Sequence, residues 1–285
     1  MVVFPNSKIN LGLHIIRTRQ DGYHDLETVF YPLMIKDVLE VIGNTGDGMR
    51  DTGYGMRDAG CGMVEFSASG LQVEGSIDNN LCLKAYHLLK KDFPSLPSIK
   101  MHLHKAIPMG AGLGGGSSDA AFTLQLLNEK FQLGIGDDCL LEYALQLGSD
   151  CPFFIRNKPC FATGRGEQME NITLDLSSYQ FFIVHPGIHI STGWAFSQIH
   201  PSIPKKSIKS IIQQPISTWK EELKNDFENA VIQQYPAISD IKKQLYQAGA
   251  LYASMTGSGS TVYGIFEKNA SPALSFPSTY YTQIA

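Results

Sequence analysis

The sequence predicts a protein of mixed α and β structure arranged in two lobes. Segments in which apolar and polar residues alternate, as they do in strands, are interspersed with segments of helical periodicity. Of the 285 residues, 43% are hydrophobic and 18% are charged, which is ample for a large core in two lobes. Because the pattern restarts beyond residue 160, we assign one domain to residues 1–160 and a second to residues 161–285.

The first sixteen residues predict a half-buried strand. Lys8, Asn10 and His14 alternate with apolar residues, so this pattern places their side chains on one face of a sheet. The turn at 19–22 contains Asp-Gly, a dipeptide that favours turns, and a second strand is expected after it.

Residues 43–62 contain a seven-residue tandem duplication, in which 49–55 is repeated as 56–62. The segment is poor in large apolar side chains and cannot form a core of its own. We therefore predict an expanded, mobile surface loop between two strands.

The remaining elements follow from caps and helix breakers. Asn79 or Asn80 can cap a helix that ends before Pro94. Pro152 disfavours helical backbone at the residue before it, so a loop or the entry to a strand is expected there. Helices are expected over residues 139–147, 217–234 and 238–248, and a strand, a glycine turn and a strand over 252–266.

A glycine-rich loop is the most informative segment of the chain. Five glycines fall within seven positions, and a helix starting at Ser117 or Ser118 would aim unpaired N–H groups and the positive end of its dipole into the loop. Both features favour a phosphate. The candidate ATP-binding residues are Pro108, Met109, Gly110, Ala111, Gly112, Leu113, Gly114, Gly115, Gly116, Ser117 and Ser118.

Other glycine-rich motifs fit this loop poorly. A dinucleotide fold needs an acidic residue at the end of a second strand, but Asp137, 22 positions after Gly115, precedes another helix. The sequence also lacks the Gly-Lys-Ser/Thr of a Walker loop, the His-Arg-Asp of protein kinases and the Gly-x-Ser-x-Gly of a nucleophile elbow. The remaining alternative is a turn that only lets a helix pack tightly.

Charge, hydrophobic pattern and cysteine content indicate which partners and which compartment to expect. The formal net charge of −4 gives no electrostatic reason to expect nucleic acid. No segment approaches the roughly 18 apolar residues that span a bilayer, so no membrane is expected. The five cysteines are odd in number and without C-x-x-C spacing, which favours a reduced, cytoplasmic protein.

Three motifs together resemble the GHMP small-molecule kinases. Residues 108–118 resemble the central phosphate-binding motif of that family, residues 5–11 the first motif and residues 255–260 the third, in the family's order. The resemblance implies an α+β, two-lobed GHMP kinase fold, with an N-terminal ribosomal-S5-like lobe and a C-terminal ferredoxin-like lobe. It also implies ATP with Mg²⁺. The first motif has Asn-Ser-Lys where the family more often has Pro-Ala-Lys.

Several shorter motifs resemble those of one branch of that family. They are Asp-Gly-Tyr-His at 21–24, the triple glycine at 114–116, the segment 147–152 and His-Pro-Gly at 185–187. This branch phosphorylates the 2-hydroxyl of 4-diphosphocytidyl-2-C-methyl-D-erythritol, a small-molecule substrate on the non-mevalonate route to isoprenoid precursors.

The resemblance also implies the two catalytic residues. Asp150 matches the carboxylate that accepts the proton of the alcohol, and Lys8 would orient it and stabilise negative charge. On the residues alone, the alternative for Asp150 is a residue that forms a turn or caps a helix, and the alternative for Lys8 is an ordinary exposed strand lysine.

The same resemblance implies a cytidine pocket. Tyr23 and Phe196 would stack on the base, with Trp194 as the alternative ring, while His24 and Asn10 would bind its edge. Gly257 and Gly259 would bring a second backbone segment to the phosphates and substrate, although a plain hairpin turn is the alternative. The sequence does not identify metal ligands, because His102 and His104 without a third ligand are too few for a metal site.

Two rival functions remain open. The chain could be another GHMP kinase, acting on mevalonate, homoserine or a sugar, although these have no cytosine to stack. It could also be a relative that binds ATP as a sensor, which the presence of Lys8 and Asp150 disfavours. The sequence does not give the oligomeric state.

Overall fold

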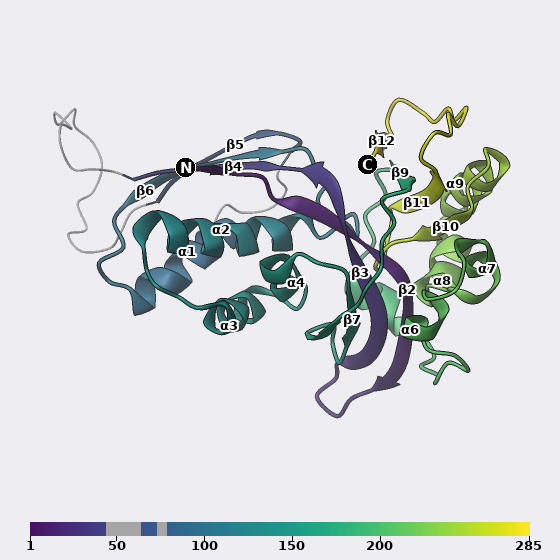
Figure 1. Ribbon diagram of the computed structural model, residues 1–285, viewed down its shortest axis with the longest axis horizontal. Coiled ribbons are helices and arrows are strands. Elements are labelled where there is room, and N and C mark those ends of the chain that lie inside the picture. Colours follow the sequence, from purple (N-terminus) through teal and green to yellow (C-terminus); the bar gives the residue numbers. More distant parts are fainter. Residues whose placement is uncertain (44–63, 73–78) are drawn as a thin grey trace.

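The computed structural model describes residues 1–43, 64–72 and 79–285. Within these residues the strands form three four-stranded sheets, which lie side by side along the long axis of the molecule with helices packed against them (Figure 1). The expectation for the duplicated segment at 43–62 falls almost entirely outside the described residues.

The first sheet has the order β1-β4-β6-β5, and helices cover one of its faces (Figure 1). Its hydrophobic core fills the space between the sheet and these helices, with Leu103, Leu124 and Leu127 among the buried side chains. Asn80 caps the first helix by accepting a hydrogen bond from the Cys82 N–H, as the sequence predicts. The elements are β1 (Val2–Val3), β4 (Val38–Gly43), β5 (Val64–Gly70), β6 (Ile99–Lys105), α1 (Leu81–Asp92), α2 (Gly115–Phe131) and α3 (Asp137–Leu147).

The second sheet, of order β2-β3-β7-β8, lies in the middle of the molecule. Two long antiparallel strands run from the first lobe to the second (Figure 1) and supply buried residues to all three hydrophobic cores. The third strand of the sheet, β7, spans the expected domain boundary between residues 160 and 161, which stays a prediction. The elements are β2 (Asn6–Thr18), β3 (His24–Lys36), β7 (Cys160–Thr163) and β8 (Gln168–Asn171).

The third sheet, of order β10-β11-β9-β12, belongs to the C-terminal part of the chain. Two of its strands, β10 and β11, and the turn between them are the strand, glycine turn and strand that the sequence predicts at 252–266. The elements are β9 (Tyr179–His185), β10 (Tyr252–Met255), β11 (Val262–Glu267), β12 (Tyr281–Ile284), α5 (Thr192–Ser197), α6 (Ile208–Ile211), α7 (Ile216–Glu222), α8 (Phe227–Gln234) and α9 (Pro236–Gln247).

The expected placement of His14 is wrong, because β2 contains a bulge at Gly12. Leu11 pairs with Val29 and Leu13 with Thr28, so Gly12 is an extra residue in the ladder, with a φ of +71°. A shift of one residue exchanges the two faces of a strand. His14 therefore lies on the face opposite Lys8 and Asn10, where it contacts Asp226 at 2.9 Å. The strand is also buried on both faces from Asn6 to Leu13 rather than half-buried.

The segment after Asp150 is a helix, not a loop or strand. α4 (Cys151–Arg156) has Pro152 in its first turn. Proline is tolerated there because the N–H groups of the first turn have no partner within the helix. The short helix packs its phenylalanines into the first core, where Phe153 and Phe154 are fully buried.

The expected helix over 217–234 is two helices, α7 and α8, separated at Leu223–Asp226. Here the backbone leaves the helix and pairs with β2: the Leu13 N–H donates to the Lys224 carbonyl at 2.8 Å, and the Asp226 N–H donates to the Leu13 carbonyl at 2.9 Å. The Asn225 side chain donates to the carbonyls of Met255 and Gly257. These bonds replace those of a continuous helix.

Candidate active site

The glycine-rich loop connects β6 to α2 and has left-handed backbone at Gly110, Gly112 and Gly114, with φ between +61° and +78°. α2 begins at Gly115, and Gly114 is its N-cap residue with no side-chain capping bond. The expectation that Ser117 or Ser118 starts and caps this helix is therefore wrong. The unpaired N–H groups of the first turn instead come from the glycines themselves, which leaves the backbone open to an anion.

The three motifs meet at one point, although they lie far apart in the sequence. Thr256 of the third motif donates its hydroxyl to the Gly112 carbonyl at 3.1 Å and accepts the Asn10 N–H at 3.0 Å. A side chain at Gly112 would overlap the Thr256 carbonyl. The Tyr263 hydroxyl donates to the Asn10 carbonyl at 2.9 Å. The glycine loop, β2 and the turn after β10 are thus fixed to one another.

Lys8 and Asp150 form an ion pair beside the start of α2. The Lys8 Nζ lies 3.3 Å from the Asp150 Oδ2, donates to the Asn10 Oδ1 at 2.6 Å and lies over the Phe30 ring. Lys8 is buried, whereas the Asp150 side chain is 34% exposed. A side chain at Gly114 would meet Lys8 and Phe154, so the glycine lets the lysine pass close beneath the loop.

The backbone around Asp150 leaves its carboxylate available. α3 ends at Leu147, and the N–H of its C-cap residue Gly148 donates to the Ala144 carbonyl. Asp150 stands at the N-cap position of α4, but its side chain makes no capping bond. Burial raises the pKa of the adjacent Cys151 thiol to about 12, so this group stays protonated and is a poor nucleophile.

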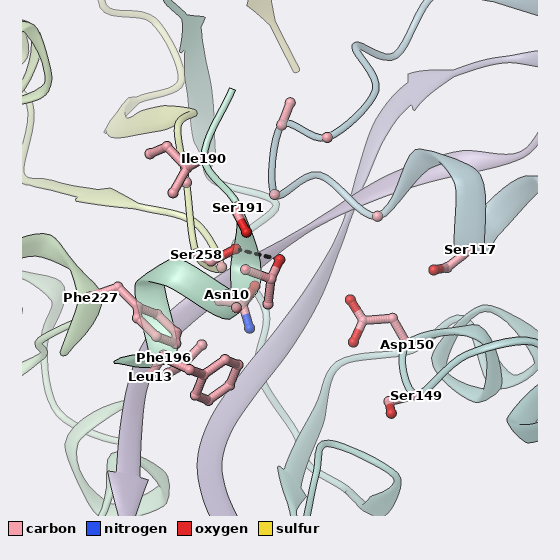
Figure 2. Close-up of a pocket in the computed structure, with 18 of the residues that line it drawn as sticks. Asn10, Leu13, Ser117, Ser149, Asp150, Ile190, Ser191, Phe196, Phe227 and Ser258 are labelled. Carbon is pink, nitrogen blue, oxygen red and sulfur yellow. Dashed lines mark hydrogen bonds between the residues drawn. The ribbon is translucent and has the colours of Figure 1, made fainter. Parts of the chain in front are cut away.

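A cleft of about 1190 Å³ joins these elements. Asp150 and Ser117 lie on one side of it, and Asn10, Ser258 and Phe196 lie on the other (Figure 2). The predicted residues that line it are Lys8, Asn10, Tyr23, His24, Pro108, Met109, Gly110, Ala111, Gly112, Gly114, Gly115, Gly116, Ser117, Asp150, Phe196, Gly257 and Gly259.

Two predicted residues do not line the cleft. Leu113 is fully buried in the second hydrophobic core, although its carbonyl accepts the Lys8 N–H at 2.9 Å. Ser118 is fully buried on α2. Both belong to the motif by sequence, but the turn of the loop and the helical periodicity direct their side chains away from the cleft.

The aromatic residues at the far end of the cleft form a pocket. The rings of His24 and Phe196 stack with centroids 4.8 Å apart, and the Arg165 guanidinium lies over the Tyr23 ring. Trp194 instead packs edge-on against Tyr235 and does not line the cleft. Phe196 is thus the ring that lies with Tyr23 and His24 around this end.

Sequence reasoning missed three contributors to the site. Arg165 lines the cleft, and Asn225 holds the third motif by two hydrogen bonds to its carbonyls. Lys105 is buried behind the loop, where it donates to Asp119 at 2.7 Å and to Asp37. An Asn-Asp pair within a helical pattern is a usable signal for Asn225, because both residues compete with helix by local hydrogen bonds.

Among the residues that the structure describes, no group of three or more His, Cys, Asp or Glu is arranged to hold a metal ion. None of the helices in the described ranges combines the length and the apolar character that crossing a bilayer requires.

Comparison with known proteins identifies the family. The GHMP kinases N terminal domain family matches residues 80–158, and the GHMP kinases C terminal family matches residues 207–281. A 4-diphosphocytidyl-2-C-methyl-D-erythritol kinase of Bacteroides thetaiotaomicron is 51% identical over 267 residues, which cover 94% of this chain and 92% of that protein. One from Azobacteroides pseudotrichonymphae is 48% identical over 277 residues, which cover 97% of each protein.

Solved structures agree with this assignment. A crystal structure of 4-(cytidine 5'-diphospho)-2C-methyl-D-erythritol kinase has a TM-score of 0.76 at 27% identity, covering 94% of this chain and 91% of that one. A mevalonate kinase with a TM-score of 0.67 at 12% identity, covering 93% and 91%, shares the fold. The expected α+β GHMP kinase fold is confirmed, and the chain belongs to the 4-diphosphocytidyl-2-C-methyl-D-erythritol kinase family of the GHMP kinases.

Proposed function

We propose that this chain transfers the γ-phosphoryl group of ATP to the 2-hydroxyl of 4-diphosphocytidyl-2-C-methyl-D-erythritol. The observation that carries the proposal is the Lys8–Asp150 pair, 3.3 Å apart, in a cleft that the glycine loop and an aromatic pocket also line. The names of the relatives, at about half identity over nearly the whole chain, supply the substrate.

The glycine loop would hold the triphosphate. Its left-handed glycines and the first turn of α2 present backbone N–H groups without side chains in the way. The helix dipole adds positive potential at the same place. Because these donors are fixed by the fold, little reorganisation is needed as negative charge develops during transfer.

Asp150 would act as the general base. Its carboxylate accepts the proton of the 2-hydroxyl while the hydroxyl oxygen bonds to the γ-phosphorus, the bond from that phosphorus to the bridging oxygen breaks, and ADP leaves with the electron pair. Lys8 holds the carboxylate by its 3.3 Å ion pair, and Asn10 fixes the lysine in turn. The ammonium also lies where it can stabilise charge on the transferring group.

The aromatic end of the cleft would recognise the cytosine. Stacking needs planar faces, which Tyr23 and Phe196 supply, and the His24 ring can bind the polar edge of the base. The acceptors mevalonate and homoserine have no cytosine that such a pocket could bind.

The site fits a Mg²⁺ ion that arrives with ATP. Magnesium prefers oxygen ligands and is commonly held by substrate phosphates with one or two protein groups. The Ser117 hydroxyl lines the cleft at the start of α2 and is the protein oxygen group that would help the phosphates to hold it. Bound there, the ion would neutralise charge on the phosphates. We also expect a cytoplasmic location, where the free thiols of Cys82, Cys139, Cys151 and Cys160 stay reduced.

An acceptor-dependent ADP-release assay tests the proposal. The purified chain receives Mg-ATP and, in separate reactions, 4-diphosphocytidyl-2-C-methyl-D-erythritol, mevalonate or homoserine. We expect rapid ADP release with the first acceptor and none above background with the others. Turnover on another alcohol would assign a neighbouring kinase activity, and ATP binding without acceptor-dependent turnover would favour a sensor.

A further inference from the structure

Arg165 lies in the hairpin turn Gly164–Gly166 and lines the cleft, but the reaction above leaves it without a role. Gly164 and Gly166 both have left-handed backbone, with φ of +67° and +104°. The Leu26 N–H donates to the Gly164 carbonyl at 2.7 Å, and the Gly166 N–H donates to the Thr163 carbonyl at 3.0 Å. The turn is thus fixed to β3 just after the residues of the base pocket.

This turn lies between the two ends of the acceptor site. The Arg165 guanidinium carbon is 4.8 Å from the centroid of the Tyr23 ring, at the base pocket. A Cβ atom on the next residue, Gly166, would lie 4.0 Å from the Asp150 Oδ1, at the site of proton transfer. One side of the turn therefore lies at Tyr23 and the other lies near the Asp150 carboxylate.

Arg165 also supplies a second cationic side chain to the cleft. Apart from Lys8, it is the one Lys or Arg side chain among the described residues that line the cleft. Lys8 is already engaged by Asp150 and Asn10.

The arginine is only weakly paired within its own hairpin. Its Nε lies 4.0 Å from Glu167 Oε1, and the other oxygen of Glu167 accepts the Arg165 backbone N–H at 2.5 Å. The charge of Arg165 also helps to lower the pKa of Asp21, after the larger effects of the Tyr23 N–H and Arg19. The Arg165 side chain is 33% exposed, so its donors remain accessible.

We propose that Arg165 binds the diphosphate that joins the cytidine to the sugar alcohol. This inference rests on the function proposed above, since that acceptor has a base at one end, an alcohol at the other and a diphosphate between them. A guanidinium presents a planar fork of donors that fits two phosphate oxygens at once. Stacking on Tyr23 holds the fork in place before the acceptor arrives, which lowers the entropy cost of binding.

The test compares Arg165→Met with the wild-type chain. Methionine keeps much of the aliphatic volume but removes the charge and the donors. We expect KM for the cytidine-linked acceptor to rise about 10- to 100-fold, in line with the loss of a charge-assisted contact, with KM for ATP within twofold and kcat less affected than KM. Arg165→Lys keeps the charge without the fork and should recover part of the loss.

Binding measurements separate charge recognition from support of the Tyr23 ring. Arg165→Met should lose about tenfold or more in affinity for CDP but less than threefold for cytidine, which has no phosphate. An equal loss for both ligands would mean that Arg165 only props the ring, and no loss for either would also overturn the inference.

Arg17→Met is the matched control for Arg165→Met, and turnover by the wild-type chain checks the function proposed above. Arg17→Met removes an arginine whose side chain is 75% exposed and lies outside this cleft, and it should change no parameter by more than twofold. If the wild-type chain does not phosphorylate the acceptor, the proposed function fails. If it does so and Arg165→Met behaves like the wild type, only the role of Arg165 fails.

Discussion

Two lysines approach consecutive glycines of the phosphate loop, and they are paired with carboxylates in opposite ways. Lys8 lies against Gly114 and pairs with the single, partly exposed carboxylate of Asp150. Lys105 lies against Gly115 and pairs with the carboxylates of Asp37 and Asp119, both buried.

The surroundings of the two pairs suit the lysines to different roles. Asp37 also accepts the N–H groups of Ala106 and Ile107, so the buried network ties the strand before the loop to the helix after it. Burial raises the pKa of Asp119 to about 7, against the pull of Lys105. Burial likewise opposes charge on Lys105, but the two carboxylates outweigh it and raise the pKa of this lysine. The Asp150 carboxylate, by contrast, faces the cleft, where it can exchange a proton. One pair is therefore suited to chemistry, and the other is suited to holding the loop.

The largest expected effect is on catalysis at the exposed pair. Asp150→Asn keeps the size of the side chain but removes the base, so kcat should fall by about 10³-fold. ATP affinity and the thermal unfolding midpoint should stay close to the wild type, because the glycine loop and the core are untouched. A variant that retains a tenth or more of the wild-type kcat would remove Asp150 from the role of base.

The next largest effect is on stability at the buried pair. Lys105→Met leaves two buried carboxylates without their cation, so the free energy of unfolding should fall by about 3–5 kcal/mol. Urea unfolding followed by circular dichroism measures this loss. Lys206→Met, which breaks the exposed pair with Glu222, is the control and should cost about 1 kcal/mol or less. Equal losses in the two variants would contradict the structural role given to Lys105.

A third effect should appear at the glycine that separates the loop from Lys8. Gly114→Ala places a side chain on left-handed backbone and against Phe154 and Lys8, so it should cost about 2 kcal/mol of stability or more. Gly116→Ala is the matched control for stability: its backbone is helical and a Cβ would meet nothing closer than 3.9 Å. It should be neutral or stabilise by up to about 1 kcal/mol. If urea unfolding shows the reverse order, the loop geometry is wrong.

The smallest effect is a change in pH dependence. Because the pKa of Asp119 is raised to about 7 in the folded chain but is ordinary, near 4, in the unfolded chain, the folded state binds more protons between these values. The contribution of Asp119 to stability is therefore full below pH 4 and falls as pH rises to about 7. Asp119→Asn should flatten this fall. Urea unfolding at pH 5 and at pH 7.5 measures it, and an unchanged slope would contradict the shift.

The sequence was sufficient to predict the residues of the exposed pair but not those of the buried one. Lys8 and Asp150 stand in motifs with unusual glycine, proline and charge patterns, and these motifs also predict the fold. Asp37, Lys105 and Asp119 stand at ordinary positions near element ends, and only tertiary packing brings them together. A pattern that is local in sequence does not record such a contact.

The local errors of the sequence prediction also arise from contacts between segments that are distant in the sequence. The bulge at Gly12 reverses the face of His14, and alternation alone does not reveal an inserted residue. The break at Asn225 depends on carbonyls of the third motif, some thirty residues away in the sequence. Arg165 gives no signal by itself, because its position beside Tyr23 follows from the pairing of β7 with β3.

A double-mutant cycle tests the central claim most directly: that the Lys8 ammonium and the Asp150 carboxylate act as one unit beside the glycine loop. The single-turnover rate of phosphoryl transfer is measured for the wild type, Lys8→Met, Asp150→Asn and the double variant, with ATP and acceptor saturating. If the two groups act together, the double variant should be no more than about tenfold slower than the slower single variant. If the double variant is instead slowed by the full product of the two single-variant factors, Lys8 and Asp150 act independently and the central claim is wrong.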